Sequence, residues 1–138
     1  FVHDVLTGFD LKKEPRTILD AYNDNQGITR QFNLNLLTRI NRELDADFNT
    51  RKFDHFAVYD PVQGAARSYL ISLEEQEVNI GAAGKRFYFK PYETIYTEIS
   101  QKFDDHMIQE LADRHELTIT GNFRDSRNWY ADVLYRKL

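Results

Sequence analysis

Three segments of the chain have the hydrophobic spacing of helices. A short helix is predicted to start at Pro15, since proline suits the first helical turn, and another follows Asp104, whose carboxylate can cap it. The longest has apolar residues at every fourth position: Ile28, Phe32, Leu36, Ile40 and Leu44. This period predicts a helix over the whole of that segment.

The remaining apolar segments are short and favour strands. They cover residues 5–10, 55–59, 67–73, 77–80, 86–89, 92–100, 117–123 and 129–135. Gly81-Ala82-Ala83-Gly84 separates two of them and predicts a hairpin turn. The order of elements predicts an α/β (mixed α+β) fold.

Composition narrows the class of protein. The chain has 138 residues, 41% of them hydrophobic and 29% charged, which is typical of one ordinary domain. There is no cysteine, which excludes disulfides and a thiol nucleophile in this chain, and we expect a cytoplasmic protein. A net charge of −4 argues against nucleic acid or a membrane as partner. Because the chain opens at Phe1, we expect a processed product or a fragment.

One predicted strand offers candidate chemistry. Its residues alternate between two faces, so a polar row and an apolar row are expected: Tyr96, Glu98 and Ser100 against Ile95, Thr97 and Ile99. The apolar row is expected to pack into a core. The polar row could line a pocket that accepts hydrogen bonds from an N–H-bearing ligand. A strand with water on that face explains the pattern equally.

Other candidates have simpler explanations. Tyr22 is typical of a core tyrosine with a solvated hydroxyl, and we expect Asn33, beside Phe32, to be exposed. The four histidines lack metal-ligand spacing, so we expect no metal site. No serine has a nucleophile-elbow setting, and the glycines form no phosphate-binding loop.

Three motifs together resemble one family. They are Gly8-Phe9-Asp10-Leu11-Lys12-Lys13, the run from Ala21-Tyr22-Asn23-Asp24 through Phe32-Asn33 to Asn41-Arg42-Glu43-Leu44, and Thr97-Glu98-Ile99-Ser100-Gln101-Lys102-Phe103. Their order and spacing resemble the C-terminal part of the SAM-dependent histidine N-methyltransferases, the ergothioneine-pathway enzyme and its relatives.

The resemblance implies a domain organisation. Residues 1–13 would form a late strand of a Rossmann-like methyltransferase sheet. Residues 14–100 would form a substrate-binding domain of two helices and an antiparallel meander. Residues 101–138 would return to the methyltransferase domain as a helix and two strands. The family's SAM-binding half has no counterpart, so S-adenosylmethionine is implied for the full-length protein and none is expected on this chain.

The resemblance also implies a substrate site, with histidine as the expected amino acid. Tyr22 would hold the substrate carboxylate, and Glu98 and Ser100 the imidazole ring, while catalytic residues stay unassigned. The family's histidine enzymes carry a methionine where this chain has Ser68, a fourth substrate-binding position, so a different amino acid stays open.

Two other functions stay open beside the C-terminal part of an α-N-methyltransferase. The chain could be a stand-alone small-molecule-binding or interaction module without catalytic activity. It could also be an assembly protein, because a truncated methyltransferase sheet leaves an unpaired strand edge. For that reason we expect the isolated chain to self-associate by strand exchange. A clean monomer by light scattering at high concentration would count against this.

Overall fold

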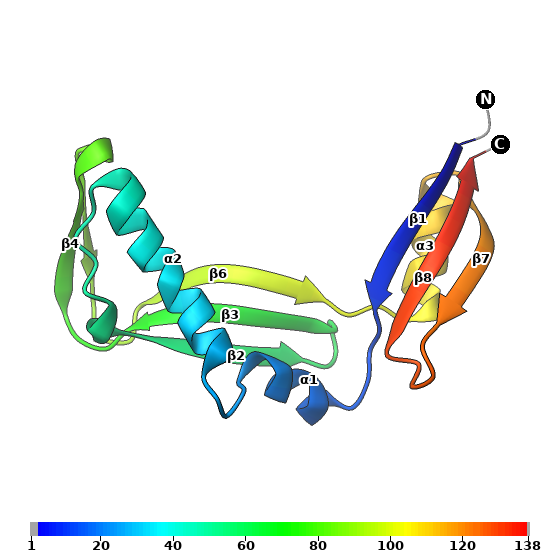
Figure 1. Ribbon diagram of the computed structural model, residues 1–138, viewed down its shortest axis with the longest axis horizontal. Coiled ribbons are helices and arrows are strands. Elements are labelled where there is room, and N and C mark those ends of the chain that lie inside the picture. Colours follow the sequence, from blue (N-terminus) through cyan, green and yellow to red (C-terminus); the bar gives the residue numbers. More distant parts are fainter. Residues whose placement is uncertain (1–2, 138) are drawn as a thin grey trace. The chain divides into compact units, whose positions relative to one another are not determined.

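A computed structural model describes residues 3–137 and confirms the mixed α/β class (Figure 1). The elements, in chain order, are β1 (His3–Asp10), α1 (Pro15–Tyr22), α2 (Ile28–Leu44), β2 (Phe53–Asp60), β3 (Ala65–Ser72), β4 (Gln76–Ile80), β5 (Lys85–Phe89), β6 (Thr94–Gln101), α3 (Asp105–Arg114), β7 (Thr118–Arg124) and β8 (Tyr130–Lys137). The predicted helices and strands therefore all form, with small differences at their ends. None of the helices in this described part is long and apolar enough to cross a membrane.

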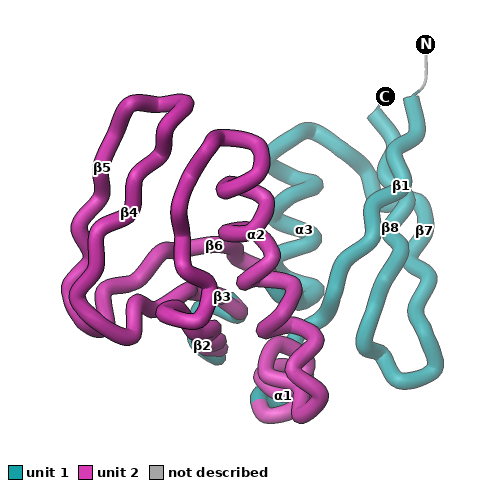
Figure 2. Tube along the Cα trace, turned by 60° about the vertical axis from the view of Figure 1, so that its left-hand side comes forward, with its two compact units in different colours: residues 1–15, 60–65, 101–138 teal, residues 16–59, 66–100 magenta. Residues whose placement is uncertain are grey.

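The chain divides into two compact units, coloured separately in Figure 2. Unit 1 contains residues 1–15, 60–65 and 101–138, and unit 2 contains residues 16–59 and 66–100. The assignment of residues 14–100 to substrate binding, and of 1–13 and 101–138 to a methyltransferase sheet, stays a prediction.

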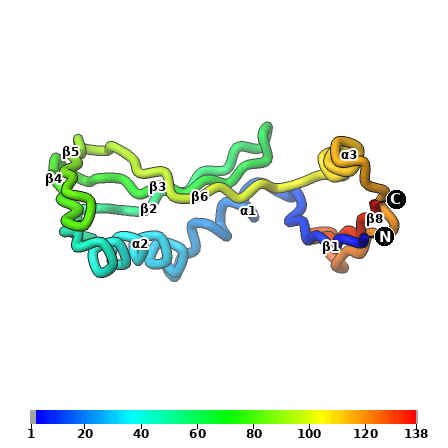
Figure 3. The backbone as a smooth tube through the Cα atoms, turned by 90° about the horizontal axis from the view of Figure 1, so that it is seen from above, coloured from blue at the N-terminus to red at the C-terminus, as the bar shows by residue number. Residues whose placement is uncertain are grey.

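Unit 1 is built on an antiparallel sheet with the strand order β1-β8-β7. Helix α3 packs on one face of it (Figures 1 and 3). As predicted, Asp104 caps this helix: its carboxylate accepts a hydrogen bond from the Met107 backbone N–H at 2.9 Å. The apolar core comprises Phe9, Leu11, Ile108, Ala112, Ala131, Val133 and Tyr135. On the other side of β1 no described strand pairs with it, and self-association through that edge stays a prediction.

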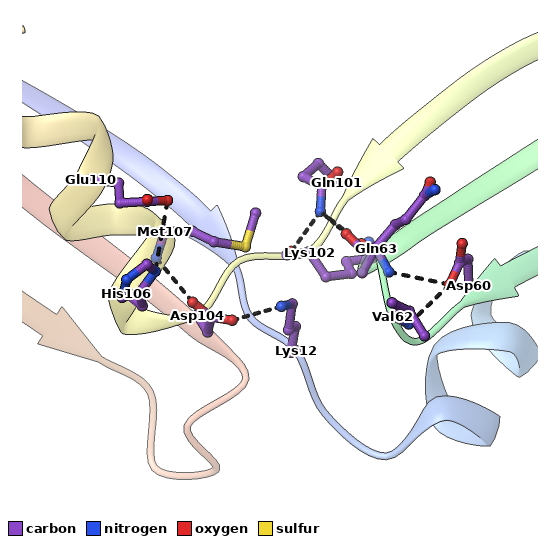
Figure 4. Close-up of polar contacts among 11 residues, drawn as sticks. Lys12, Asp60, Val62, Gln63, Gln101, Lys102, Asp104, His106, Met107 and Glu110 are labelled. Atoms are coloured by element: carbon purple, nitrogen blue, oxygen red, sulfur yellow. Dashed lines mark hydrogen bonds and ion pairs between the residues drawn. The ribbon is translucent and has the colours of Figure 1, made fainter. Parts of the chain in front are cut away.

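A buried ion pair ends β1 in unit 1. Lys102 is only 2% exposed, and its Nζ lies 2.6 Å from a carboxylate oxygen of Asp10. Lys13 contacts the other oxygen of Asp10 at 2.5 Å. Close by in sequence, Lys12 donates to Asp104 at 2.6 Å (Figure 4). The lysines of the first and third family-like motifs are therefore all paired with carboxylates of unit 1.

Unit 2 contains most of a sheet with the order β2-β3-β6, and helix α2 lies along one face of it (Figures 1 and 3). Strands β4 and β5 form a separate antiparallel hairpin whose turn is Gly81 to Gly84, as predicted. The core beneath α2 comprises Leu37, Phe48, Phe53, Leu70 and Val78.

Only part of the apolar series of α2 is buried: Ile40 packs against the core, whereas Ile28, Phe32, Leu36 and Leu44 are exposed. Asn33 is 3% exposed, so the prediction that it faces solvent is wrong. It lies on the buried face with Leu37 and Asn41, and the Asn41 amide bonds both the N–H and the C=O of Phe48 at 2.8 Å. Asparagine is buried here because it satisfies polar groups that the sheet and loops bring to the helix. Phe32, one residue away from Asn33, is 70% exposed.

Candidate functional site

Glu98 and Ser100 both lie on β6 and are half-buried, whereas Ile99 between them is 52% exposed. The predicted sharing of one face by Glu98 and Ser100 agrees with this alternation. Ile95 packs on the unit 2 core as expected, but the prediction of a buried Ile99 is wrong.

The burial pattern of β6 changes phase between Thr97 and Glu98, which are both half-buried. Up to Thr97 the odd-numbered positions are the less exposed ones, whereas Glu98 and Ser100 are less exposed than Ile99 between them. The even alternation predicted for this strand is therefore wrong at this point.

As a result, Thr97 and Glu98 line the same hollow beside α2. Its volume is about 250 Å³, and the residues around it are Phe32, Asn33, Asn35, Leu36, Arg39, Thr97 and Glu98. This volume is just below the ~300–1,000 Å³ of most ligand pockets, so the hollow suits a ligand of amino-acid size. Of the described residues, those lining it include Glu98 but not Tyr22, Ser68 or Ser100.

The wall of the hollow is held by a chain of hydrogen bonds. The Thr97 hydroxyl lies 2.8 Å from the Asn33 side-chain oxygen and 3.0 Å from the Ser68 carbonyl oxygen, and it can donate to either. The Asn33 amide nitrogen donates to the Thr29 carbonyl at 3.1 Å. These contacts tie β6 to the first half of α2, which fixes the strand beside Glu98.

His55 is a polar neighbour of Glu98. In the sequence it stood out only as one of the four histidines considered as metal ligands. Its Nε2 lies 3.1 Å from the hydroxyl of Ser68, which is fully buried on β3. Burial lowers the pKa of the His55 imidazole below its ordinary value of 6.5, and the negative charge of Glu98 opposes that shift. Burial thus favours the neutral form of the imidazole, which lies within the electrostatic reach of Glu98. No group of three or more potential ligands in residues 3–137 is placed to hold a metal.

Tyr22 is the half-buried last residue of α1, in the same unit as Glu98. The turn after it leads directly into α2. Asp24 closes this turn, because its two carboxylate oxygens accept hydrogen bonds from the backbone N–H groups of Ile28 and Thr29 at 2.9 and 2.8 Å. The start of α2, and with it Asn33, is positioned by this cap.

We expect Asp24 to titrate at unusually low pH. Backbone hydrogen bonds from Thr29 and Ile28 lower its pKa from 3.8 to about 2. A depressed pKa means that the cap stabilises the fold above the ordinary value and is lost as the pH falls through about 2. Carboxyl-carbon NMR of the chain measures this directly. An Asp24 carboxyl that titrates near 3.8 would contradict the cap.

The Glu98 hollow supplies recognition groups and no nucleophile. A carboxylate accepts N–H donors, and Asn33 and Thr97 add neutral polar groups at its wall. The paired strands of the unit 1 sheet are antiparallel, and the sequence has no glycine-rich strand–turn–helix, so residues 3–137 form no nucleotide crevice of the doubly wound kind.

Comparison with known proteins gives one consistent result. A family model described as "Histidine-specific methyltransferase, SAM-dependent" matches residues 3–137. The histidine N-alpha-methyltransferase of Mycobacterium tuberculosis is 38% identical over 109 residues, which are 78% of this chain and 34% of that protein. Its counterpart from Mycolicibacterium smegmatis is 34% identical over 110 residues, 79% of this chain and 34% of that protein.

A more distant relative covers nearly the whole chain. Ergothioneine biosynthesis protein 1 of Schizosaccharomyces pombe is 25% identical over 138 residues, which are 99% of this chain and 18% of that protein. The chain therefore spans about a third of the length of the mycobacterial relatives and less than a fifth of the fission yeast protein.

Proposed function

Since the chain belongs to the family of SAM-dependent, histidine-specific methyltransferases, we propose that it is the part of such an enzyme that binds the amino-acid substrate. The observation that supports this most is the half-buried Glu98 carboxylate, which lines a hollow of about 250 Å³ beside α2. Family membership implies S-adenosylmethionine in the full-length protein, where the rest of the polypeptide would hold it.

In this proposal the chain binds and orients the substrate. Glu98 accepts a hydrogen bond from an imidazole N–H of histidine. The family resemblance assigns Ser100 to the same ring and Tyr22 to the substrate carboxylate, although neither residue lines the Glu98 hollow of the described chain. A carboxylate acceptor for a ring N–H gives a stronger hydrogen bond than a neutral acceptor. Holding the ring and the carboxylate fixes the direction of the α-amine, and such positioning supplies most of what a transfer reaction needs from its acceptor site.

Ser68 enters the proposal through His55. Its hydroxyl is fully buried and bonds the His55 imidazole, and neither residue lines the Glu98 hollow. Because the family's histidine enzymes carry methionine at the position of Ser68, a substrate other than histidine stays open.

The test is a thermal-shift screen of the standard amino acids on the complete gene product with S-adenosylmethionine present. Histidine is expected to raise the melting temperature most. At a concentration a hundred times the dissociation constant, a ligand stabilises by about 2.7 kcal/mol, or a few degrees in a protein of this size or larger. A response to histidine no greater than that to glycine would refute the proposal. A response of the isolated 138-residue chain to histidine without any transfer in the complete product would favour a binding module instead.

A further inference from the structure

The outer face of the first half of α2 is apolar and exposed. Ile28 is 62%, Phe32 70% and Leu36 39% exposed. We refer to these three residues as the exposed stripe. Single exposed apolar residues are common on proteins, but three that follow one another at a spacing of four form a continuous patch.

The first half of α2, which carries the exposed stripe, contains a single charged residue, Arg30, whose side chain pairs with Asp54 at 2.5 Å. From Gln31 to Thr38 the helix has no charged residue, and its other exposed side chains are Gln31, Asn35 and Thr38. The second half of α2 differs, because its exposed positions include Arg39 and Glu43, which form an ion pair at 3.1 Å. Protein interfaces are depleted of charge at their centre and enriched in aromatic residues. This composition indicates an interface over the first half of α2 and solvent over the second.

Hollows on the two flanks of the exposed stripe extend the same surface. One, of about 520 Å³, is lined by Ile28, Gln31, Phe32, Leu34, Asn35, Thr38 and Thr50. The other is the Glu98 hollow, whose lining includes Phe32 and Leu36. Phe32 therefore stands between them, and a partner that covers the exposed stripe also closes over Glu98.

We propose that the exposed stripe is the docking surface for the cofactor-binding portion of the complete polypeptide. The inference rests on the function proposed above: a methyl donor must reach an amino acid held beside Glu98, so the part that carries the donor has to approach the rim formed by Phe32 and Leu36. The mycobacterial relatives contain about twice as much chain outside the matched region as inside it, which is enough for such a portion.

A second copy of this chain fits the surface less well. The first half of α2, the eleven residues from Ile28 to Thr38, spans only about 16 Å. A stable interface between two separate proteins buries roughly 800 Å² on each partner, which is a large area for so short a helical segment. A symmetric pairing through the exposed stripe would also seal the Glu98 hollow with another copy of the same face.

The test measures the accessibility of position 32 with a thiol reagent. Phe32→Cys is made in the isolated 138-residue chain, which has no cysteine of its own, and in the complete gene product. Maleimide modification at that position is followed by peptide mass spectrometry. The matched control is Arg42→Cys, on the charged half of the same helix, where the arginine side chain is 74% exposed. Circular dichroism verifies that both variants fold.

We expect position 32 to react at least tenfold more slowly in the complete product than in the isolated chain, and position 42 to change less than twofold. Equal rates at position 32 would overturn the proposal, as would a gene that encodes nothing beyond these residues. Slow reaction in the isolated chain that becomes fast on dilution would assign the surface to a second copy. Because the readout needs no ligand, protection at position 32 without a histidine response would refute the substrate assignment and leave the docking surface standing.

Discussion

Asp10→Asn is expected to destabilise unit 1 by about 3 kcal/mol. The substitution removes the carboxylate charge that faces the Lys102 ammonium, which is only 2% exposed. Breaking a buried ion pair leaves an uncompensated charge and costs about 3–5 kcal/mol. The lower end applies here because the Asp10 side chain is 39% exposed, so solvent screens part of the interaction.

The effect of Asp10→Asn has a defined pH dependence. Burial raises the pKa of the Asp10 carboxyl, but hydrogen bonds from Lys102 and Lys13 outweigh it, and the pKa lies below its ordinary value of 3.8. A depressed pKa contributes stability that is present above the ordinary value and lost as the pH falls through the folded one. The difference between wild type and Asp10→Asn should therefore be complete at neutral pH and shrink in acid below 3.8.

Urea unfolding followed by tryptophan fluorescence measures this difference. Trp129 is the only tryptophan in the sequence and belongs to unit 1, like Asp10 and Lys102. The matched control is Asp4→Asn on the same strand, whose carboxylate pairs with Arg136 at 2.8 Å on the exposed surface. Exposed pairs contribute little, so the control should stay close to wild type. Equal stability losses in the two variants would contradict the role assigned to the buried pair.

Glu98→Gln is expected to weaken histidine binding about 10- to 150-fold in the complete gene product. The substitution keeps the size of the side chain but replaces a charged acceptor with a neutral amide. Hydrogen bonds to charged groups contribute about 1.5–3 kcal/mol, and each 1.4 kcal/mol is tenfold in affinity. Calorimetric titration with histidine measures the loss, and Glu75→Gln, at an exposed position between β3 and β4, is the control. Unchanged affinity would remove Glu98 from the substrate site.

The same variant has a second readout that needs no ligand. The charge of Glu98 raises the pKa of His55 against the effect of burial. In Glu98→Gln the pKa of His55 should therefore fall further below 6.5, which NMR of the imidazole can measure in the isolated chain. A His55 pKa that does not move would show that the two side chains are not neighbours, independently of any substrate.

Much of the local structure could be predicted from the sequence because it depends on residues that are close along the chain. The Asp104 cap bonds a backbone N–H three residues later, and the turn from Gly81 to Gly84 joins two adjoining strands. The family could be identified in the same way, since its motifs are continuous runs that include Tyr22, Glu98 and Ser100.

Which face of α2 is buried was decided by the tertiary structure. The helix has two series of residues at a spacing of four, one through Phe32 and one through Asn33. Hydrophobicity favours burial of the series through Phe32. Asn33, in the other series, is nevertheless buried, because its side-chain oxygen accepts a hydrogen bond from the Thr97 hydroxyl, 64 positions away in the sequence. The hydrophobic period of a helix predicts that it is amphipathic. Which face is buried depends also on the polar groups that neighbouring elements place beside the helix.

The surroundings of Glu98 were also decided by the tertiary structure. Strand alternation predicts that Glu98 and Ser100 share a face, but it cannot predict the change of phase by which Thr97 and Glu98 line the same hollow. His55 comes near Glu98 only because β2 and β6 belong to one sheet on either side of β3. The sequence by itself determined the chemical groups of the site and the elements that carry them. Their neighbours depended on pairing and packing between distant segments, which no local pattern records.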